Sequence, residues 1–225
     1  TNVRFLRNNL DLNYKFNQGS IEFIDDERKI FNHSKLIGNI KLDPFFFDLD
    51  LILSGISIET TLNNLFLYLY KTNKVSHINF NGNLKIILNE INNRLFDNLI
   101  LNINFLEEKI SLNKSSLDLK KIGKINFSEP MIYEKNQKIF VKSKIKFEID
   151  DQQELYRKFL IPRQNRIDLN KVYFELEYNI DDENYFLSNI NFNESENNKK
   201  NFYEVKNIQQ LNSIISKEFS KVSLD

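Results

Sequence analysis

Three pairs of adjacent aspartates are the residues of this chain best suited to acid–base chemistry. They are Asp25–Asp26, Asp150–Asp151 and Asp181–Asp182. Two carboxyl groups on either side of a glycosidic bond can hydrolyse it. Neighbouring residues on a strand point to opposite faces, however, and all three pairs interrupt the alternation of apolar and polar residues around them. We therefore interpret them as turn residues and not as catalytic pairs.

The chain offers little else for catalysis, metal binding or cofactor binding. It has no cysteine, which excludes disulfides, thiolate metal ligands and cysteine nucleophiles. Its two histidines, His33 and His77, lack the spacing of a metal site. It contains neither a glycine-rich phosphate loop nor a nucleophile elbow. The sequence predicts a protein that is not an enzyme and has no catalytic residue, metal ion or cofactor.

The charge and hydropathy of the chain exclude two further classes of protein. Lys and Arg total 31, as do Asp and Glu, so the formal net charge is zero. Such a chain has no overall field to attract phosphate backbones, which argues against a nucleic-acid partner. No apolar run approaches the roughly 20 residues that a membrane-spanning helix needs. The chain starts at Thr1 without a signal-like stretch, so we expect it to be part of a longer protein.

Alternation with a period of two dominates the chain and predicts strands. The segment Lys144 to Asp150 is typical, because Ile145, Phe147 and Ile149 share one face while lysine and glutamate occupy the other. Alanine, the best helix former, is absent, whereas β-branched and aromatic residues are plentiful. We therefore expect a mostly-β protein with a long antiparallel meander over residues 1–193.

Helical spacing interrupts this pattern in a few places. Apolar residues three and four apart predict a short helix over Thr60 to Tyr70. A helical turn is expected between Asp150 and Phe159, and Pro162, three residues later, would prevent it from continuing. Residues 194–202 are polar and are interpreted as a linker. Residues 203–225 then show the spacing of a C-terminal amphipathic helix.

The width of the predicted sheet raises the functional question. About ten strands side by side would extend roughly 45 Å. A flat sheet of that width would expose an apolar face, which soluble proteins rarely tolerate. The sheet must therefore close into a barrel, pair into a sandwich, or curl into an elongated groove with an apolar interior. A sandwich core and a groove require the same one-sided strands, so the alternation alone leaves both open.

The stretch from Leu36 to Phe192 resembles the C-terminal region of the AsmA-like family. Ile37 to Phe45 contains a glycine, alternating apolar residues and a Pro-Phe pair. This pattern is similar to the segment with which a repeat of that family begins. An alternating strand and a short helix follow over Leu51 to Leu65, and Phe80 to Ile86 resembles the next strand. Phe147 to Leu169 resembles the closing part of the region. These motifs consist only of glycines and apolar residues at recurring positions, and none of them contains a catalytic signature.

The resemblance implies a fold, a location and a partner. Members of the AsmA-like family resemble β-troughs with an apolar interior that project into the periplasm of Gram-negative bacteria from an inner-membrane anchor. It implies that this chain supports phospholipid transport towards the outer membrane and envelope homeostasis. The anchor would lie in a part of the parent protein that precedes this sequence. No single residue carries over, because the function of the family lies in a continuous surface.

We therefore expect a non-enzymatic groove that shields the acyl chains of a phospholipid. The candidate groove residues are Leu51, Leu53, Leu84, Ile86, Leu101, Ile103, Ile145, Phe147, Phe174 and Leu176. One alternative is a module for outer-membrane protein biogenesis, whose partners are assembly proteins recruited by strand addition at a sheet edge. Another is a closed β-sandwich that binds one small apolar ligand.

Overall fold

The computed structural model describes most of the chain. The described residues are 2–5, 8–25, 34–54, 63–68, 70–71, 81–89, 95–106, 109–112, 114–166, 168–192, 202–205, 210 and 213–214. They divide between two compact units, unit 1 (Thr1–Asp118) and unit 2 (Leu119–Asp225). We expected a single groove domain over residues 1–193, so this boundary is an additional feature.

Strands make up most of both units. Unit 1 contains β1 (Asn2–Phe5), β2 (Asn8–Asp11), β3 (Asn13–Asn17), β4 (Ser20–Ile24), β5 (Lys35–Leu42), β6 (Phe45–Ser54), β7 (Gly82–Asn89), β8 (Phe96–Leu106) and β9 (Lys109–Ser111). Strand β10 (Ser115–Leu119) spans the boundary. Unit 2 contains β11 (Gly123–Lys135), β12 (Lys138–Ile149), β13 (Lys171–Asn179), β14 (Asn184–Phe192), β15 (Phe202–Val205), helix α2 (Gln152–Lys158) and a 3-10 helix (Arg163–Asn165).

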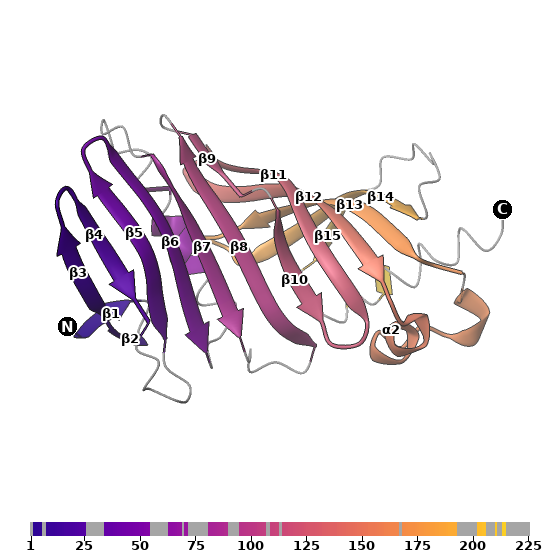
Figure 1. Cartoon of the computed structure of the whole chain (residues 1–225). Helices are drawn as coiled ribbons and strands as arrows, with labels where there is room; N and C mark the ends of the chain where they lie inside the picture. The colour runs from indigo at the N-terminus through magenta and orange to yellow at the C-terminus, as the bar shows by residue number, and fades with distance from the viewer. Residues whose placement is uncertain are drawn as a thin grey trace. The chain divides into compact units, whose positions relative to one another are not determined.

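Thirteen of these strands form one open sheet (Figure 1). Its hydrogen-bonded order is β15-β14-β13-β12-β11-β10-β8-β7-β6-β5-β4-β3, and β9 pairs with β8 beside this path. The end strands β3 and β15 do not pair with each other, so the described strands do not close into a barrel. Strands β1 and β2 form a separate two-stranded sheet. The prediction of a mostly-β, open sheet is confirmed.

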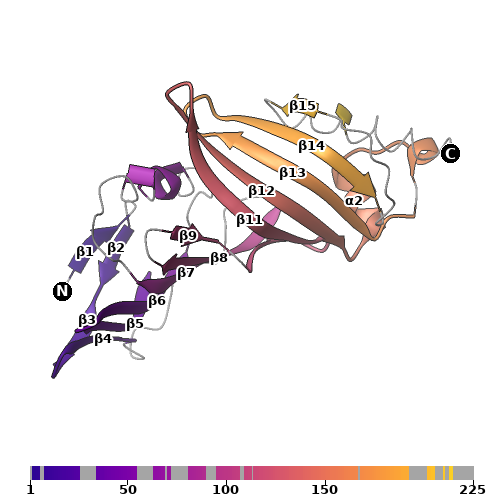
Figure 2. The same ribbon diagram turned by 90° about the horizontal axis from the view of Figure 1, so that it is seen from above.

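One strand pair departs from the predicted antiparallel meander. Strands β6 and β7 run parallel, with Leu51 opposite Ile86. Parallel neighbours need a long crossover connection, whereas antiparallel neighbours need only a tight turn. Residues 63–68 of that crossover are helical, inside the helix predicted over Thr60 to Tyr70. This helical segment lies on the same side of the unit 1 sheet as the β1–β2 hairpin (Figure 2).

Unit 2 differs from the sequence-based expectation near its C-terminal end. Phe202–Val205 forms β15, paired antiparallel with β14, where we expected the end of a linker and the start of a helix. Tyr203 and Val205 lie opposite Leu187 and Tyr185, so the alternation of this short segment serves a sheet. Residues 210, 213 and 214 are helical, and the remainder of the predicted helix lies outside the described residues.

Pro130 lies in the interior of a long strand, although proline has no amide hydrogen to donate to a neighbouring strand. It lies inside β11, where the pairing with β12 shifts between Ser128 and Met131. A bulge of this kind tolerates proline because no ladder bond is needed there. The hydroxyl of Ser143 donates a hydrogen bond to the Ser128 carbonyl at 2.9 Å, and this bond satisfies a backbone oxygen next to the irregular position.

Candidate functional site: an apolar face with an open rim

Cross-strand register arranges apolar residues of β5–β8 in rows on one face of unit 1. We call this surface the apolar face. The rows, given from β5 towards β8, are Ile40–Phe47–Gly82–Phe105, Gly38–Leu49–Leu84–Ile103, Leu36–Leu51–Ile86–Leu101 and Leu53–Leu88–Leu99. Residues directly opposite each other in a sheet share a face, so the rows form one continuous surface. Every residue in them is apolar or glycine.

The structure brings the six predicted groove residues of unit 1 together on this face. They are Leu51, Leu53, Leu84, Ile86, Leu101 and Ile103. All except Leu84 are buried, as are Leu65 and Phe66 of the helical segment at 63–68. Buried leucines and isoleucines of this kind are packed against other side chains and not against solvent. The middle of the apolar face is therefore a filled core.

An aromatic contact marks the end of this core at the start of β6. The Phe47 ring lies over Gly82, where an added Cβ would come within 2.6 Å of the ring carbons. The Phe47 ring also contacts Phe105, with 5.3 Å between centroids, and Phe45, with 6.2 Å. A side chain larger than hydrogen at position 82 would displace this ring, so the glycine fixes where the aromatic cluster can lie.

Beyond Phe47 the apolar face continues onto β3, β4 and the start of β6, where it is open. Its four exposed side chains, which we call the rim, are Tyr14, Phe16, Leu42 and Phe45. Register places Phe16 opposite Ile21 and Ile21 opposite Ile40, so the rim shares the face of the core. The Phe16 side chain is 69% exposed. Solvent therefore reaches one end of an otherwise filled apolar face.

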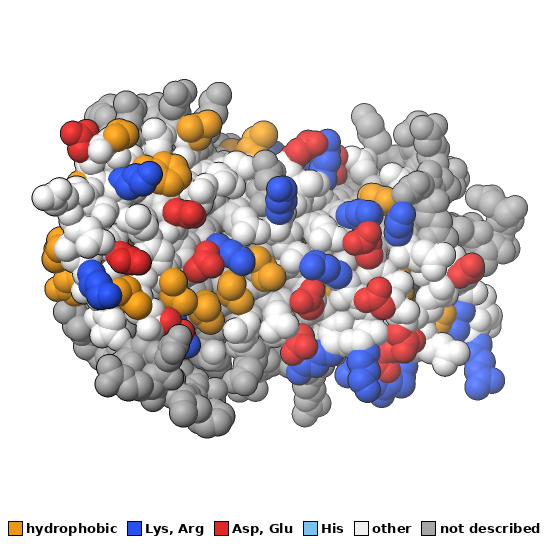
Figure 3. Space-filling model, viewed as in Figure 1, with side chains coloured by type: hydrophobic (Ala, Val, Ile, Leu, Met, Phe, Trp, Pro, Cys, Tyr) orange, Lys and Arg blue, Asp and Glu red, His pale blue; other side chains and the backbone are white. Residues whose placement is uncertain are grey.

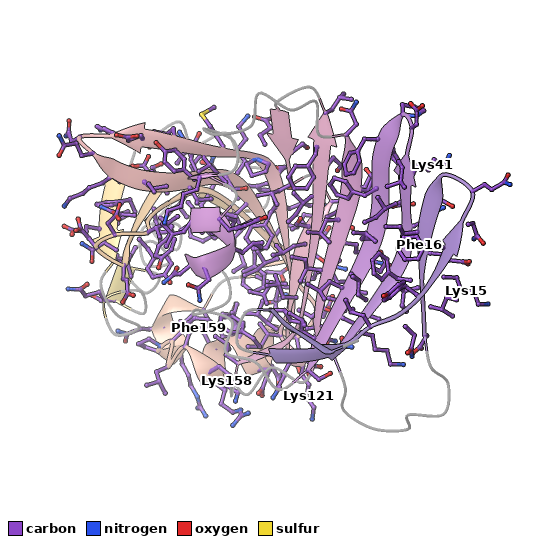
Figure 4. The ribbon with its side chains drawn as sticks, turned by 90° about the vertical axis from the view of Figure 1, so that its left-hand side faces the viewer. Lys15, Phe16, Lys41, Lys121, Lys158 and Phe159 are labelled. Atoms are coloured by element: carbon purple, nitrogen blue, oxygen red, sulfur yellow. The ribbon has the colours of Figure 1, made fainter. Side chains whose placement is uncertain are left out.

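The rim is mostly aromatic, and the nearest labelled lysines lie on the other face of the same strands. The Tyr14 ring meets the Phe16 ring edge to face, with 5.5 Å between centroids, and approaches Phe23 at 6.4 Å. Figure 4 labels Phe16 with Lys15 and Lys41 at the β3–β5 end of the sheet. Both lysines occupy the alternate strand positions and so belong to the opposite face. The rim itself is made only of apolar groups and one tyrosine hydroxyl.

The opposite face of unit 1 is mixed, because it carries polar rows together with the apolar row Ile52–Ile87–Ile100. Asn39, Asp48, Asn83 and Asn104 form one row across it, and the Asn104 amide donates to the Asn83 side-chain oxygen at 2.7 Å. Acidic, basic and hydrophobic side chains are interspersed on this face in the space-filling view (Figure 3). Phe46 is 36% exposed there, which matches the 37% of its neighbour Phe45 on the apolar face. The two faces therefore differ in continuity of apolar residues, not in the exposure of a single ring.

Unit 2 has its own apolar face, built from the register of β11–β14. Its rows include Ile125–Phe147–Val172–Phe192, Phe127–Ile145–Phe174 and Ser143–Leu176–Leu187. The four predicted residues of unit 2, Ile145, Phe147, Phe174 and Leu176, all lie on it. Ile145 and Phe147 are buried, whereas Phe174 and Leu176 are half-buried. The described residues of unit 2 show no exposed rim comparable to that of unit 1 on this face.

Ion pairs hold the other face of the unit 2 strands. Lys142 lies 2.6 Å from Glu175, Lys144 2.6 Å from Glu129, and Lys146 2.7 Å from Glu148. The hydrogen bond from Lys142 holds the pKa of the Glu175 carboxyl below its ordinary value. Such exposed pairs contribute little stability each. These charged side chains keep their own face of the strands hydrated, so the apolar side chains lie on the opposite face.

The aspartate pairs behave as turn residues wherever they are described. Asp181 accepts a hydrogen bond from the Ile139 amide at 2.7 Å, and Asp182 lies 2.5 Å from the Lys138 ammonium. Asp151 caps α2 by accepting from the Glu154 amide at 2.9 Å. Asp26, His33 and His77 lie outside the described residues. Within the described part of the chain, no cluster of three metal-ligating side chains occurs.

The rim residues were not among the sequence-based candidates. Their alternation was visible, since Tyr14 and Phe16 share a face in the sequence as they do in the sheet. What the sequence did not reveal is that β3 ends the sheet and leaves these side chains in solvent. Among the described residues, no helix is long and apolar enough to cross a bilayer. Comparison of the chain with protein families, curated proteins and solved structures finds no match.

Proposed function

We propose that this protein binds the acyl chains of phospholipids at the open rim of the apolar face of unit 1 and shields them from water there. Lipid enters at the rim, where Tyr14, Phe16, Leu42 and Phe45 are exposed. The protein acts without catalysis, as part of the movement of phospholipid towards the outer membrane of a Gram-negative cell. The observation that carries the proposal is an exposed apolar rim on the same face as a continuous apolar core.

The physical basis is the hydrophobic effect. Removing a methylene group from water is worth about 0.8 kcal/mol, so even a partly covered acyl chain gains several kcal/mol on the rim. No charged side chain lies in the rows of the apolar face, so the surface offers no fixed anchor for a headgroup. A surface of this kind favours loose, exchangeable contact with acyl chains at the rim over tight capture of one lipid.

The first test is the identification of lipid that co-purifies with the protein. We expect native mass spectrometry of protein expressed in bacteria to show a bound species with the mass of a phospholipid. Mass spectrometry under denaturing conditions then identifies the released lipid. A stable protein that carries no lipid, and takes none up from added phospholipid, would contradict the proposal.

Phe45 and Phe46 supply a matched pair of variants for the same assay. They are neighbours on β6 with nearly equal exposure, but only Phe45 lies on the apolar face. Phe45→Asp places a charge where acyl chains would lie, so we expect it to lower lipid occupancy about tenfold or more. Phe46→Asp should leave occupancy unchanged. Equal losses in the two variants, at equal thermal stability, would rule out the assignment of this face.

Strand addition at β3 is a second candidate, favoured by the exposure of every residue of this end strand. In the two-residue hairpin that joins β3 to β4, Asn17 and Ser20 are paired, so the Tyr14 amide points away from β4. Tyr14→Pro and Tyr14→Ala both remove the ring, but only proline removes this amide hydrogen. Strand addition predicts a loss of partner binding in the proline variant alone, measured by co-precipitation from envelope extracts. Acyl-chain binding predicts equal lipid occupancy in both.

A further inference from the structure

Strand β3 leaves one whole edge of the unit 1 sheet without a neighbour among the described strands. It is the last strand of the hydrogen-bonded order, and all five of its residues, Asn13–Asn17, are exposed. The other end strand, β15, differs, because its Val205 is buried. An end strand presents a row of backbone donors and acceptors with which another extended chain can pair. The outer edge of β3 is therefore the more accessible of the two ends of the strand order.

The register of the β3–β4 hairpin determines which backbone groups of β3 point outwards. Asn17 pairs with Ser20 across the two-residue turn, and the pairing continues along the hairpin without a bulge. Hydrogen-bonded and non-hydrogen-bonded pairs alternate in such a ladder. The backbone groups of Lys15 therefore point towards β4, whereas those of Tyr14 and Phe16 point away from it. Tyr14 and Phe16 each offer one donor and one acceptor to an added strand.

The side chains of β3 divide between the two faces of the sheet. Tyr14 and Phe16 lie on the apolar face, where they are 44% and 69% exposed. Lys15 lies on the opposite face, and its neighbour on β4 is Glu22. Side chains directly opposite each other on paired strands interact. An added strand would therefore meet aromatic rings on one face and an ammonium group on the other.

The outer side of Lys15 has no acidic neighbour in the described part of the chain. Glu22 lies on the β4 side of it, and no ion pair joins the two side chains. Asp25, just beyond β4, is engaged by Lys35 at 2.7 Å. Figure 4 labels Lys15 and Phe16 at the open end of the unit 1 sheet. A carboxylate on an added strand would lie directly opposite Lys15, with about 5 Å between the Cβ atoms.

Strand β4 shows which sequence pattern pairs with β3. The segment Ile21–Phe23 sets its glutamate opposite Lys15 and its apolar side chains opposite Phe16 and Tyr14. The outer edge of β3 offers the same three side chains to a second strand. A second copy of β3 fits this edge less well. If Tyr14 of one copy lay opposite Phe16 of the other, the two Lys15 side chains would face each other, and like charges in that position are unfavourable.

We propose that β3 binds an extended segment of a partner protein in which one acidic residue lies between two apolar residues. The segment adds antiparallel to the outer edge of β3 and bonds to the backbone of Tyr14 and Phe16. Its apolar side chains contact the two rings, and its carboxylate lies opposite Lys15. The inference rests on strand addition at β3, the second candidate function, and names the chemistry of the partner. It does not depend on acyl-chain binding.

The test is a titration of two fluorescein-labelled peptides with the purified chain, followed by fluorescence anisotropy. The acidic peptide has the sequence of residues 19–25, Gly-Ser-Ile-Glu-Phe-Ile-Asp, and the basic peptide has lysine in place of the glutamate. We expect the acidic peptide to bind about fivefold more tightly, because the basic peptide sets two like charges opposite each other. Added salt should reduce this difference, since the charges are exposed.

Charge exchange supplies the matched variants. Lys15→Glu should reverse the preference and bind the basic peptide about fivefold more tightly than the acidic one. Such a gain of binding cannot result from unfolding. Lys135→Glu changes the net charge equally at an exposed position of β11 and should keep the preference for the acidic peptide.

Amide hydrogen exchange, followed by NMR, locates the bound peptide. We expect exchange at Tyr14 and Phe16 to slow when the acidic peptide binds, because these amides of β3 point away from β4. Equal binding of the two peptides, or an unchanged preference in Lys15→Glu, would overturn the proposed partner chemistry while strand addition stands. Binding of neither peptide, or binding without slower exchange at these amides, would overturn strand addition at β3 as well. Lipid occupancy measured by mass spectrometry tests the acyl-chain proposal separately.

Discussion

Tyr133 shows how a single residue on the polar face of unit 2 responds to its surroundings. Its ring stacks on Phe140 with 5.5 Å between centroids. Partial burial, followed by the hydrogen bond and the charge of Glu177, raises the pKa of the Tyr133 phenol from 10.0 to about 12. The carboxylate of Glu177 favours the protonated phenol, because a tyrosinate beside it would place two negative charges together.

This raised pKa predicts a loss of stability at alkaline pH. The unfolded chain releases the phenol proton near pH 10, whereas the folded protein keeps it until about pH 12. The contribution of Tyr133 is therefore complete below pH 10 and disappears as the pH rises from 10 to 12. The free energy of unfolding of Tyr133→Phe, measured by urea titration, should fall less steeply over this interval. Identical slopes in the two proteins would contradict the assignment.

At the scale of elements, alternation predicted the strands because most of them have one face turned to apolar neighbours and one face turned to solvent. The segment around Ile145 and Phe147 is a strand with these residues buried, as expected from its lysines and glutamate. The short segment Phe202–Val205 was expected at a helix start, because four residues do not distinguish a period of two from helical spacing. The parallel β6–β7 pair followed from a crossover whose helix was predicted but whose consequence for direction was not.

The candidate site was predictable as a face but not as an opening. The alternation around Leu51 and that around Phe16 indicate the same thing, namely one apolar side. In the structure Leu51 is buried and Phe16 is exposed, because β6 has neighbours on both sides whereas β3 ends the sheet. Strand order is set by long-range pairing, to which a local pattern of apolar residues does not respond. The exposure of the rim therefore could not be predicted from the sequence and became visible only in the structure.

At the scale of the whole molecule, the open strand path implies a gradient in stability. End strands have backbone amides without a partner strand on one side, and β3 is exposed at every residue. Central strands such as β7, with Ile86 and Leu88 buried, open only when much of the sheet does. A protein that must admit lipid without unfolding would keep its entry at the weakly protected end, which is where the rim lies.

Hydrogen exchange measured by mass spectrometry can test this arrangement with and without a soluble short-chain phospholipid. We expect amides of β3 and β4 to exchange fastest in the free protein and those of β7 and β8 slowest. Lipid should slow exchange in β3–β5 and at the start of β6, because acyl chains cover the rim there. It should change β7 and β8 little, since their apolar side chains are already packed. Protection confined to unit 2, or no protection by lipid anywhere, would contradict entry at the rim. The Phe45→Asp variant should show the same gradient but no response to lipid, which links the exchange pattern to the apolar face and not to a general effect of lipid on the sheet.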